Sequence, residues 1–98
     1  MTDDLEKINA LALKLHGSVE KADAYTFQSL DEHVREVKAL LASGDGHWKA
    51  ETMDIIIHGL TLLNRHGVSE DEGADLLMER AGRFQEKIST AIKLQDQG

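Results

Sequence analysis

The chain of 98 residues contains no cysteine and no proline, and its aromatic residues are one tryptophan, one tyrosine and two phenylalanines. Because there is no cysteine, no disulfide bond can form, which fits a protein of a reducing compartment. Because there is no proline, the composition contains no strong helix breaker. The length is enough for one small domain, and we expect residues 1–98 to form a single all-α domain.

Basic residues are scarce: 11 lysines and arginines stand against 18 aspartates and glutamates, and the net charge is −7. A surface of this charge repels nucleic-acid backbones and anionic membranes, so we expect neither as a partner. It also repels a free phosphorylated ligand. Binding such a ligand would require metal ions or a local basic patch.

Long apolar runs are also missing, because His58, Gly59 and Thr61 interrupt the longest one. No segment therefore has the apolar length that a transmembrane helix requires. The opening residues, MTDDLE, are acidic where a signal peptide would be basic. These features predict a cytoplasmic protein.

The spacing of apolar residues predicts four helices and no strand. We expect them to run from about Asp3 to His16, from just after Ser29 to just before Gly44, from about Trp48 to His66, and from near Glu70 to about Leu94. Residues 17–28 are ambiguous and would contain a turn or a short helix. Residues 95–98 are expected to be frayed.

Capping signals set these boundaries. Thr2 is expected as the N-cap of the first helix. Ser29 with Glu32 and Ser69 with Glu72 have the spacing of capping boxes. Glycines 17 and 67 follow the first and third helices and are expected to end them.

The third helix is apolar almost all the way round, yet Glu51, Asp54 and His58 fall on one stripe of it. A helix that is apolar all round is normally buried, and buried carboxylates require a cation or a partner. Two interpretations remain open: a divalent metal at Glu51 and Asp54, or acids placed in the first turn by the helix dipole.

The apolar faces of the third helix also have to be covered by other helices. Three neighbouring helices in so short a chain can hardly cover all of its faces. We therefore expect a four-helix bundle-like protomer that assembles as a homodimer or a higher oligomer such as a tetramer.

Glu32 and Glu36 lie one turn apart on the second helix. Taken alone they suit a solvated acidic face. However, the loop to the third helix is short enough to make the two helices antiparallel neighbours, so these acids could converge with Glu51 and Asp54. Mg²⁺ prefers such oxygen ligands and often bridges substrate phosphates.

Residues 31–68 resemble the all-α nucleotide pyrophosphohydrolases, the superfamily that includes MazG and phosphoribosyl-ATP pyrophosphohydrolase. The sequence Glu51-Thr-Met-Asp54 matches the ExxD motif of that superfamily, and the segment around Glu32 and Glu36 resembles its ExxE helix. One position departs from the motif, since His33 occupies the place of its first glutamate. Imidazole is a poor ligand for Mg²⁺ and suits softer metals.

The resemblance implies hydrolysis of a nucleotide between the α and β phosphates, with release of pyrophosphate. It implies Mg²⁺, or alternatively Mn²⁺, held by Glu32, Glu36, Glu51 and Asp54, with Glu36 and Glu51 as the catalytic residues. The roles of His33 and His58 stay open. The histidines at 16, 47, 58 and 66 share no ligand spacing with cysteine or aspartate, so no zinc site is expected.

Candidate substrate-binding residues are Arg80, Arg83 and Lys87, which share one stripe of the fourth helix. Arginine suits phosphate binding, although Glu79 could pair with Arg83 in an ordinary surface ion pair. Trp48 could stack on a base or pack at the start of its helix. The leading hypothesis is therefore a metal-dependent nucleotide pyrophosphohydrolase. The alternative, favoured by His33, is a non-catalytic helical interaction module that keeps the fold.

Overall fold

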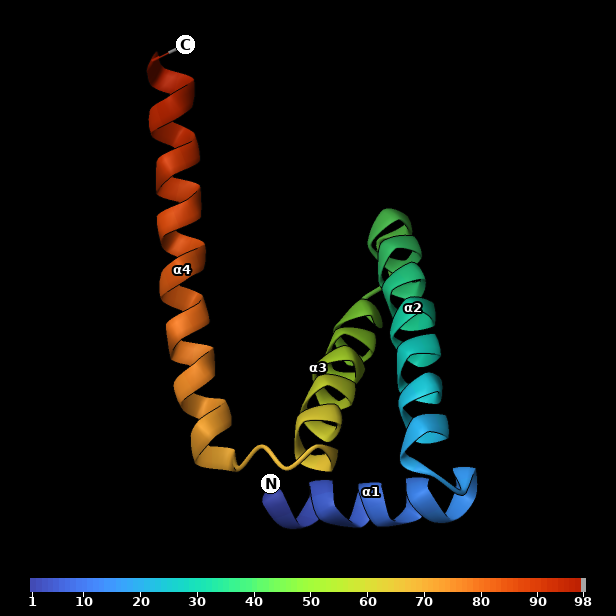
Figure 1. Ribbon diagram of the computed structural model, residues 1–98. Helices are drawn as coiled ribbons and strands as arrows, with labels where there is room; N and C mark the ends of the chain where they lie inside the picture. The colour runs from blue at the N-terminus through green and yellow to red at the C-terminus, as the bar shows by residue number, and fades with distance from the viewer. Residues whose placement is uncertain (98) are drawn as a thin grey trace. The chain divides into compact units, whose positions relative to one another are not determined.

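The computed structural model describes residues 1–97, which form four helices (Figure 1). These are α1 (Thr2–His16), α2 (Val19–Ser43), α3 (Trp48–Arg65) and α4 (Glu70–Gln97). No strand occurs in this part of the chain, which confirms the all-α prediction. None of the four helices combines the length and apolarity needed to cross a membrane.

The ends of α1 differ from the prediction in one respect. The helix begins at Thr2, so the expectation that Thr2 is the N-cap is wrong; Met1 holds that position and offers no capping side chain. At the other end, Gly17 adopts a left-handed conformation with φ of 88° and donates its N–H to Leu13 O over 2.8 Å. The predicted glycine stop is therefore confirmed.

Helix α2 begins at Val19, eleven residues before Leu30, the first residue of the predicted helix. Ser18 is its N-cap, and the Ser18 hydroxyl accepts a hydrogen bond from Lys21 N over 3.2 Å. Ser29 lies inside the helix and is buried. The prediction failed because the buried face of this segment includes Thr26 and Ser29, whose hydroxyls conceal the apolar period.

The remaining boundaries agree closely with the prediction. Helix α3 starts at Trp48 as expected and ends at Arg65, one residue early. Before α4, Ser69 accepts a hydrogen bond from Glu72 N over 3.1 Å, as the capping spacing predicts. Helix α4 continues through residues 95–97, which were expected to be frayed, and Gly98 lies outside the described residues.

The chain divides into two compact units, Met1–Val68 and the residues from Ser69 onward. In the first unit, α2 and α3 pack along each other as an antiparallel pair, and α1 packs across one end of that pair (Figure 1). The second unit contains α4, and no residue of this helix is buried. The apolar side chains on its stripe include Leu77, Phe84 and Ile88, all of them exposed.

A polar network joins the three helices of the first unit. Arg65 of α3, whose side chain is only 3% exposed, donates hydrogen bonds to Asp23 Oδ1 over 2.6 Å and to Asn9 Oδ1 over 3.2 Å. Asp23 also pairs with His66 Nε2 over 2.7 Å. The Arg65 guanidinium, and then His66, hold the pKa of the Asp23 carboxyl below its ordinary value. This network compensates the burial of Arg65.

Candidate metal centre

Helices α2 and α3 meet through a loop of four residues, 44–47. Gly44 ends α2 with φ of 75°, a conformation that glycine adopts without strain. Asp45 Oδ1 accepts a hydrogen bond from His47 N over 2.9 Å and fixes the loop before α3 begins. The tight connection brings the last half of α2 against the first turn of α3, where Glu51 lies.

A cluster of three potential metal ligands forms at this place. His33 and Glu36 of α2 and Glu51 of α3 each offer one ligand atom, and these atoms lie within 4.8 Å of one another. His33 Nδ1 is 2.5 Å from Glu51 Oε2. His47 Nε2 approaches the other oxygen of the same carboxylate, Oε1, at 3.6 Å. We call His33, Glu36 and Glu51 the ligand cluster.

The two carboxyl groups of the ligand cluster shift each other's pKa. A hydrogen bond with Glu51, together with the repulsion of its charge, raises the pKa of Glu36 above the ordinary glutamate value. The pKa of Glu51 is lowered, chiefly by its hydrogen bond with His33 and then by that with Glu36. Glu51 is therefore the more readily ionised of the two carboxyl groups.

His58 lies beside the ligand cluster, with its ring centroid 5.3 Å from that of His33. Burial is the main reason why the pKa of His58 is lowered, and the charge of His33 adds to it. Asp54 acts in the opposite direction on the same pKa. The neutral imidazole is therefore favoured at His58.

The structure brings together some of the predicted site residues and leaves others apart. Glu36 and Glu51 meet as expected, and His33, whose role was open, joins them. Glu32 and Asp54 are not members of the cluster found among the described residues. The Glu32 carboxylate instead accepts a hydrogen bond from Gln28 over 3.4 Å.

His47 was not identified as a site residue from the sequence. It precedes Glu51 by four residues, which places both on one side of the first turn of α3. The spacing of four residues between His47 and Glu51 is the sequence signal that could have identified His47.

The predicted substrate-binding residues lie in different units. Trp48, half-buried at the start of α3, accepts a hydrogen bond at its carbonyl from the Thr52 hydroxyl over 2.8 Å. On α4, Arg83 is 3.5 Å from Glu79, as the surface-pair interpretation allows. Arg80 lies 5.8 Å from the centre of the Phe84 ring. Lys87 is exposed on the same helix.

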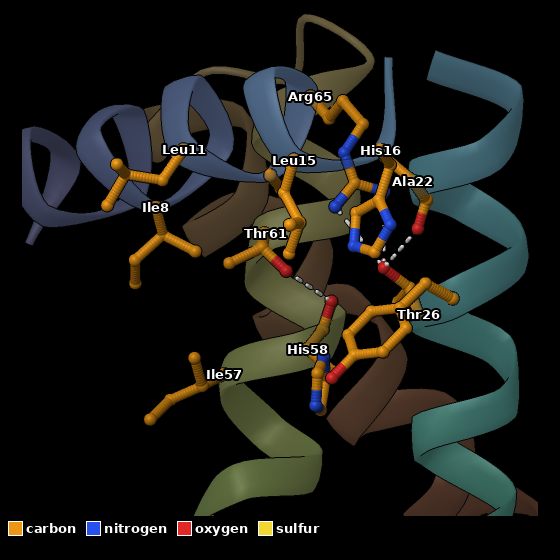
Figure 2. A pocket seen from close by; sticks show the side chains of 12 residues that line it. Ile8, Leu11, Leu15, His16, Ala22, Thr26, Ile57, His58, Thr61 and Arg65 are labelled. Atoms are coloured by element: carbon orange, nitrogen blue, oxygen red, sulfur yellow. Dashed lines mark hydrogen bonds between the residues drawn. The ribbon is translucent and has the colours of Figure 1, made fainter. Parts of the chain in front are cut away.

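An apolar pocket of about 200 Å³ opens between α1, α2 and α3. Figure 2 shows Ile8, Leu11 and Leu15 of α1 on one side of it and Ile57 of α3 below. His58 also lines this pocket while its ring lies next to His33. His58 therefore connects the pocket with the ligand cluster.

Comparison with known proteins finds no match among protein-family models, curated proteins or solved structures. The site itself consists of an imidazole and two carboxylates between two antiparallel helices, and His58 connects it with an apolar pocket.

Proposed function

We propose that this chain is a metal-dependent nucleotide pyrophosphohydrolase. The observation that carries the proposal is the contact between the Glu36 and Glu51 carboxyl groups, which come from two helices and converge on one point. When two carboxyl groups in contact both ionise, the repulsion between their charges raises the free energy unless a cation binds between them. A divalent cation, for which the sequence resemblance implies Mg²⁺ or Mn²⁺, would satisfy both.

The net charge of −7 supports a cation at this site. An acidic protein repels a nucleoside triphosphate unless positive charge is supplied locally. A bound divalent ion would neutralise phosphate charge and stabilise the departing pyrophosphate. Hydrolysis would add water to the α phosphorus and break its bond to the bridging oxygen, with Glu36 and Glu51 orienting the reacting groups.

The apolar pocket supports a ligand with a planar, weakly polar part. His58, which lies beside His33 of the ligand cluster, lines this pocket, and the pocket volume of about 200 Å³ is smaller than the roughly 300–1,000 Å³ typical of pockets for whole drug-sized ligands. We propose that it receives the base while the phosphates lie at the cluster.

The decisive test is a panel of nucleoside triphosphates with all common bases, incubated in turn with Mg²⁺, Mn²⁺, Zn²⁺ and Co²⁺ and assayed for pyrophosphate. We expect release with at least one of them, and its loss in Glu51→Gln. The matched control is Glu79→Gln, which changes an exposed glutamate of α4 and should keep the activity. If no nucleotide is hydrolysed by the parent protein, the enzyme assignment is wrong.

A non-catalytic helical interaction module is the second candidate. It is favoured by the His33–Glu51 pair, because an imidazolium 2.5 Å from the carboxylate can serve as its counter-ion without any metal. The variant His33→Glu separates the two candidates. If the chain is an enzyme, this change restores the ExxE motif and raises turnover; in an interaction module, hydrolysis stays undetectable.

We also propose that the chain assembles with itself as a homodimer or larger oligomer. Ile56, Ile57 and Leu63 of α3 are 38–47% exposed, so the helix that is apolar on all sides is only partly covered within its own unit. Several neighbouring exposed apolar side chains are typical of surfaces that bind another protein.

A further inference from the structure

The ligand cluster does not have the composition that Mg²⁺ requires. Mg²⁺ demands near-octahedral oxygen coordination and dehydrates reluctantly. Of the four carboxylates predicted as its ligands, only Glu36 and Glu51 are in the cluster, and the third member is the His33 imidazole. Nδ1 of this imidazole lies 2.5 Å from Glu51 Oε2.

A second imidazole stands on the other side of Glu51. His47 Nε2 is 3.6 Å from Oε1, whereas His33 Nδ1 faces Oε2. The His47 side chain is 65% exposed and can turn without displacing any packed group. Two imidazoles and two carboxylates are thus available within one small volume. This donor set suits first-row transition metals that accept nitrogen, such as Zn²⁺ and Co²⁺.

We propose that the site selects a nitrogen-accepting transition metal, of the Zn²⁺ and Co²⁺ type, in place of Mg²⁺. His33, Glu36 and Glu51 are the ligands, and His47 closes on the ion as the fourth. The proposal rests on the proposed function only in placing a cation at this cluster, and it does not depend on hydrolysis.

The contacts within the cluster show what metal binding must change. His33 and Glu51 are paired with each other, and Glu36 offers an oxygen atom within 4.8 Å of the ligand atoms of both. A metal ligand must be deprotonated, so a bound ion takes the place of the His33–Glu51 contact. The three groups then turn toward a common centre instead of toward one another.

Metal-free protein titrated with Co²⁺, Zn²⁺ and Mg²⁺ provides the test, with calorimetry for affinity and visible absorption for bound Co²⁺. Every nitrogen-containing site favours Zn²⁺ over Mg²⁺ to some degree, so the informative comparison is between variants. His33→Gln should weaken Co²⁺ and Zn²⁺ binding by roughly 100-fold, since loss of even an outer partner of a ligand costs about 10- to 100-fold. Mg²⁺ affinity should stay unchanged.

Two further variants complete the design. His47→Gln, at an exposed position that does not threaten folding, should weaken Co²⁺ binding and alter its absorption spectrum. His16→Gln is the matched control, because His16 stacks on Tyr25, 4.6 Å away, and takes no part in the cluster. Circular dichroism confirms that each variant is folded before its affinity is compared.

Each outcome decides between the proposals. If Co²⁺ and Zn²⁺ bind His33→Gln as tightly as the parent, or if Mg²⁺ binds the parent as tightly as Zn²⁺, transition-metal selection is overturned while the cation-dependent hydrolase stands. Metal binding that depends on His33 without pyrophosphate release under any metal overturns the hydrolase alone. If no ion binds at all, both proposals fail and His33 remains the counter-ion of Glu51.

Discussion

At the scale of the residue, the proximity of the Glu36 and Glu51 carboxyl groups is the main electrostatic feature of the site. Two carboxyl groups that meet raise the free energy of their doubly ionised form. The hydrogen bond with His33 is the largest cause of the lowered pKa of Glu51, and the hydrogen bond and charge of Glu51 raise the pKa of Glu36. Cation binding and protonation of Glu36 therefore oppose each other.

This competition predicts a pH dependence. Because the folded state raises the pKa of Glu36, the folded protein binds more protons there than the unfolded chain, and this contribution to stability falls as the pH rises through the raised value. Glu36→Gln removes the repulsion and should make the metal-free protein more stable than the parent at pH 7. Below the ordinary glutamate pKa the difference should vanish.

Chemical denaturation of the parent and of Glu36→Gln, at pH 7 and pH 3, measures this effect. Glu86→Gln on α4 is a suitable control, because Glu86 is exposed and belongs to no ligand cluster. Equal stability of parent and Glu36→Gln at pH 7 would contradict the repulsion between the two carboxylates.

A second prediction concerns Arg65, the buried cation that joins α1, α2 and α3. Arg65→Met removes the partner of Asp23 and should lower the free energy of unfolding by about 3 kcal/mol, the low end for a broken buried pair. The low end applies because Asp23 keeps His66 and is partly exposed. Arg83→Met, which breaks an exposed pair with Glu79, should change it by less than about 1 kcal/mol. Urea denaturation of both variants makes the comparison.

At the scale of the element, the turn between α2 and α3 sets which side chains face each other. Gly44 holds a left-handed conformation at the end of α2, and Asp45 N donates a hydrogen bond to Leu40 O over 3.0 Å. This pattern closes the helix and reverses the chain. The direction in which α3 leaves the turn decides that Glu51 meets His33 and Glu36.

Replacing this glycine tests the turn. Gly44→Ala should lower the free energy of unfolding by about 1–2 kcal/mol, because an alanine in the left-handed region is strained. Gly46→Ala is the matched control in the same loop: Gly46 has no positive φ, and an added Cβ would meet nothing within 4 Å. Thermal unfolding of the two variants should separate them, and equal melting temperatures would show that the turn does not require glycine.

At the scale of the whole molecule, much apolar surface is left uncovered. In the first unit Leu11 and Leu15 of α1 are 68% and 78% exposed, and in α4 no residue is buried. The buried apolar residues of the described chain are only Leu5 and Ala22. So small a core contributes little hydrophobic free energy, which is the physical reason to expect self-association.

Ile56→Lys tests that assembly. Because Ile56 is 47% exposed, a lysine there can reach solvent in an isolated chain, yet it would be an unpaired charge in an apolar interface. We expect the parent to sediment as a dimer or larger at micromolar concentration and Ile56→Lys to shift toward the monomer while staying helical. Ala10→Lys, on an exposed position of α1, should leave assembly unchanged. A parent that sediments as a folded monomer would rule out the oligomer.

The sequence by itself determined the all-α class, the starts of α3 and α4 and the glycine stop after α1. These depend on local signals, such as the Ser69–Glu72 cap. The short loop between α2 and α3 made the convergence of Glu36 with Glu51 one of two open interpretations. The start of α2 was not predicted, because this helix buries the hydroxyls of Thr26 and Ser29 on the face where an apolar stripe is expected.

Only the tertiary structure decided that His33 joins the ligand cluster, that His47 reaches Glu51, and that Arg65 binds Asp23. His33 and Glu51 are 18 residues apart, and Arg65 and Asp23 are 42 apart. Whether such side chains meet depends on how far one helix slides and rotates against the next, and a shift of one residue turns a side chain by about 100°. The packing of α2 against α3 sets that register, which no local pattern encodes.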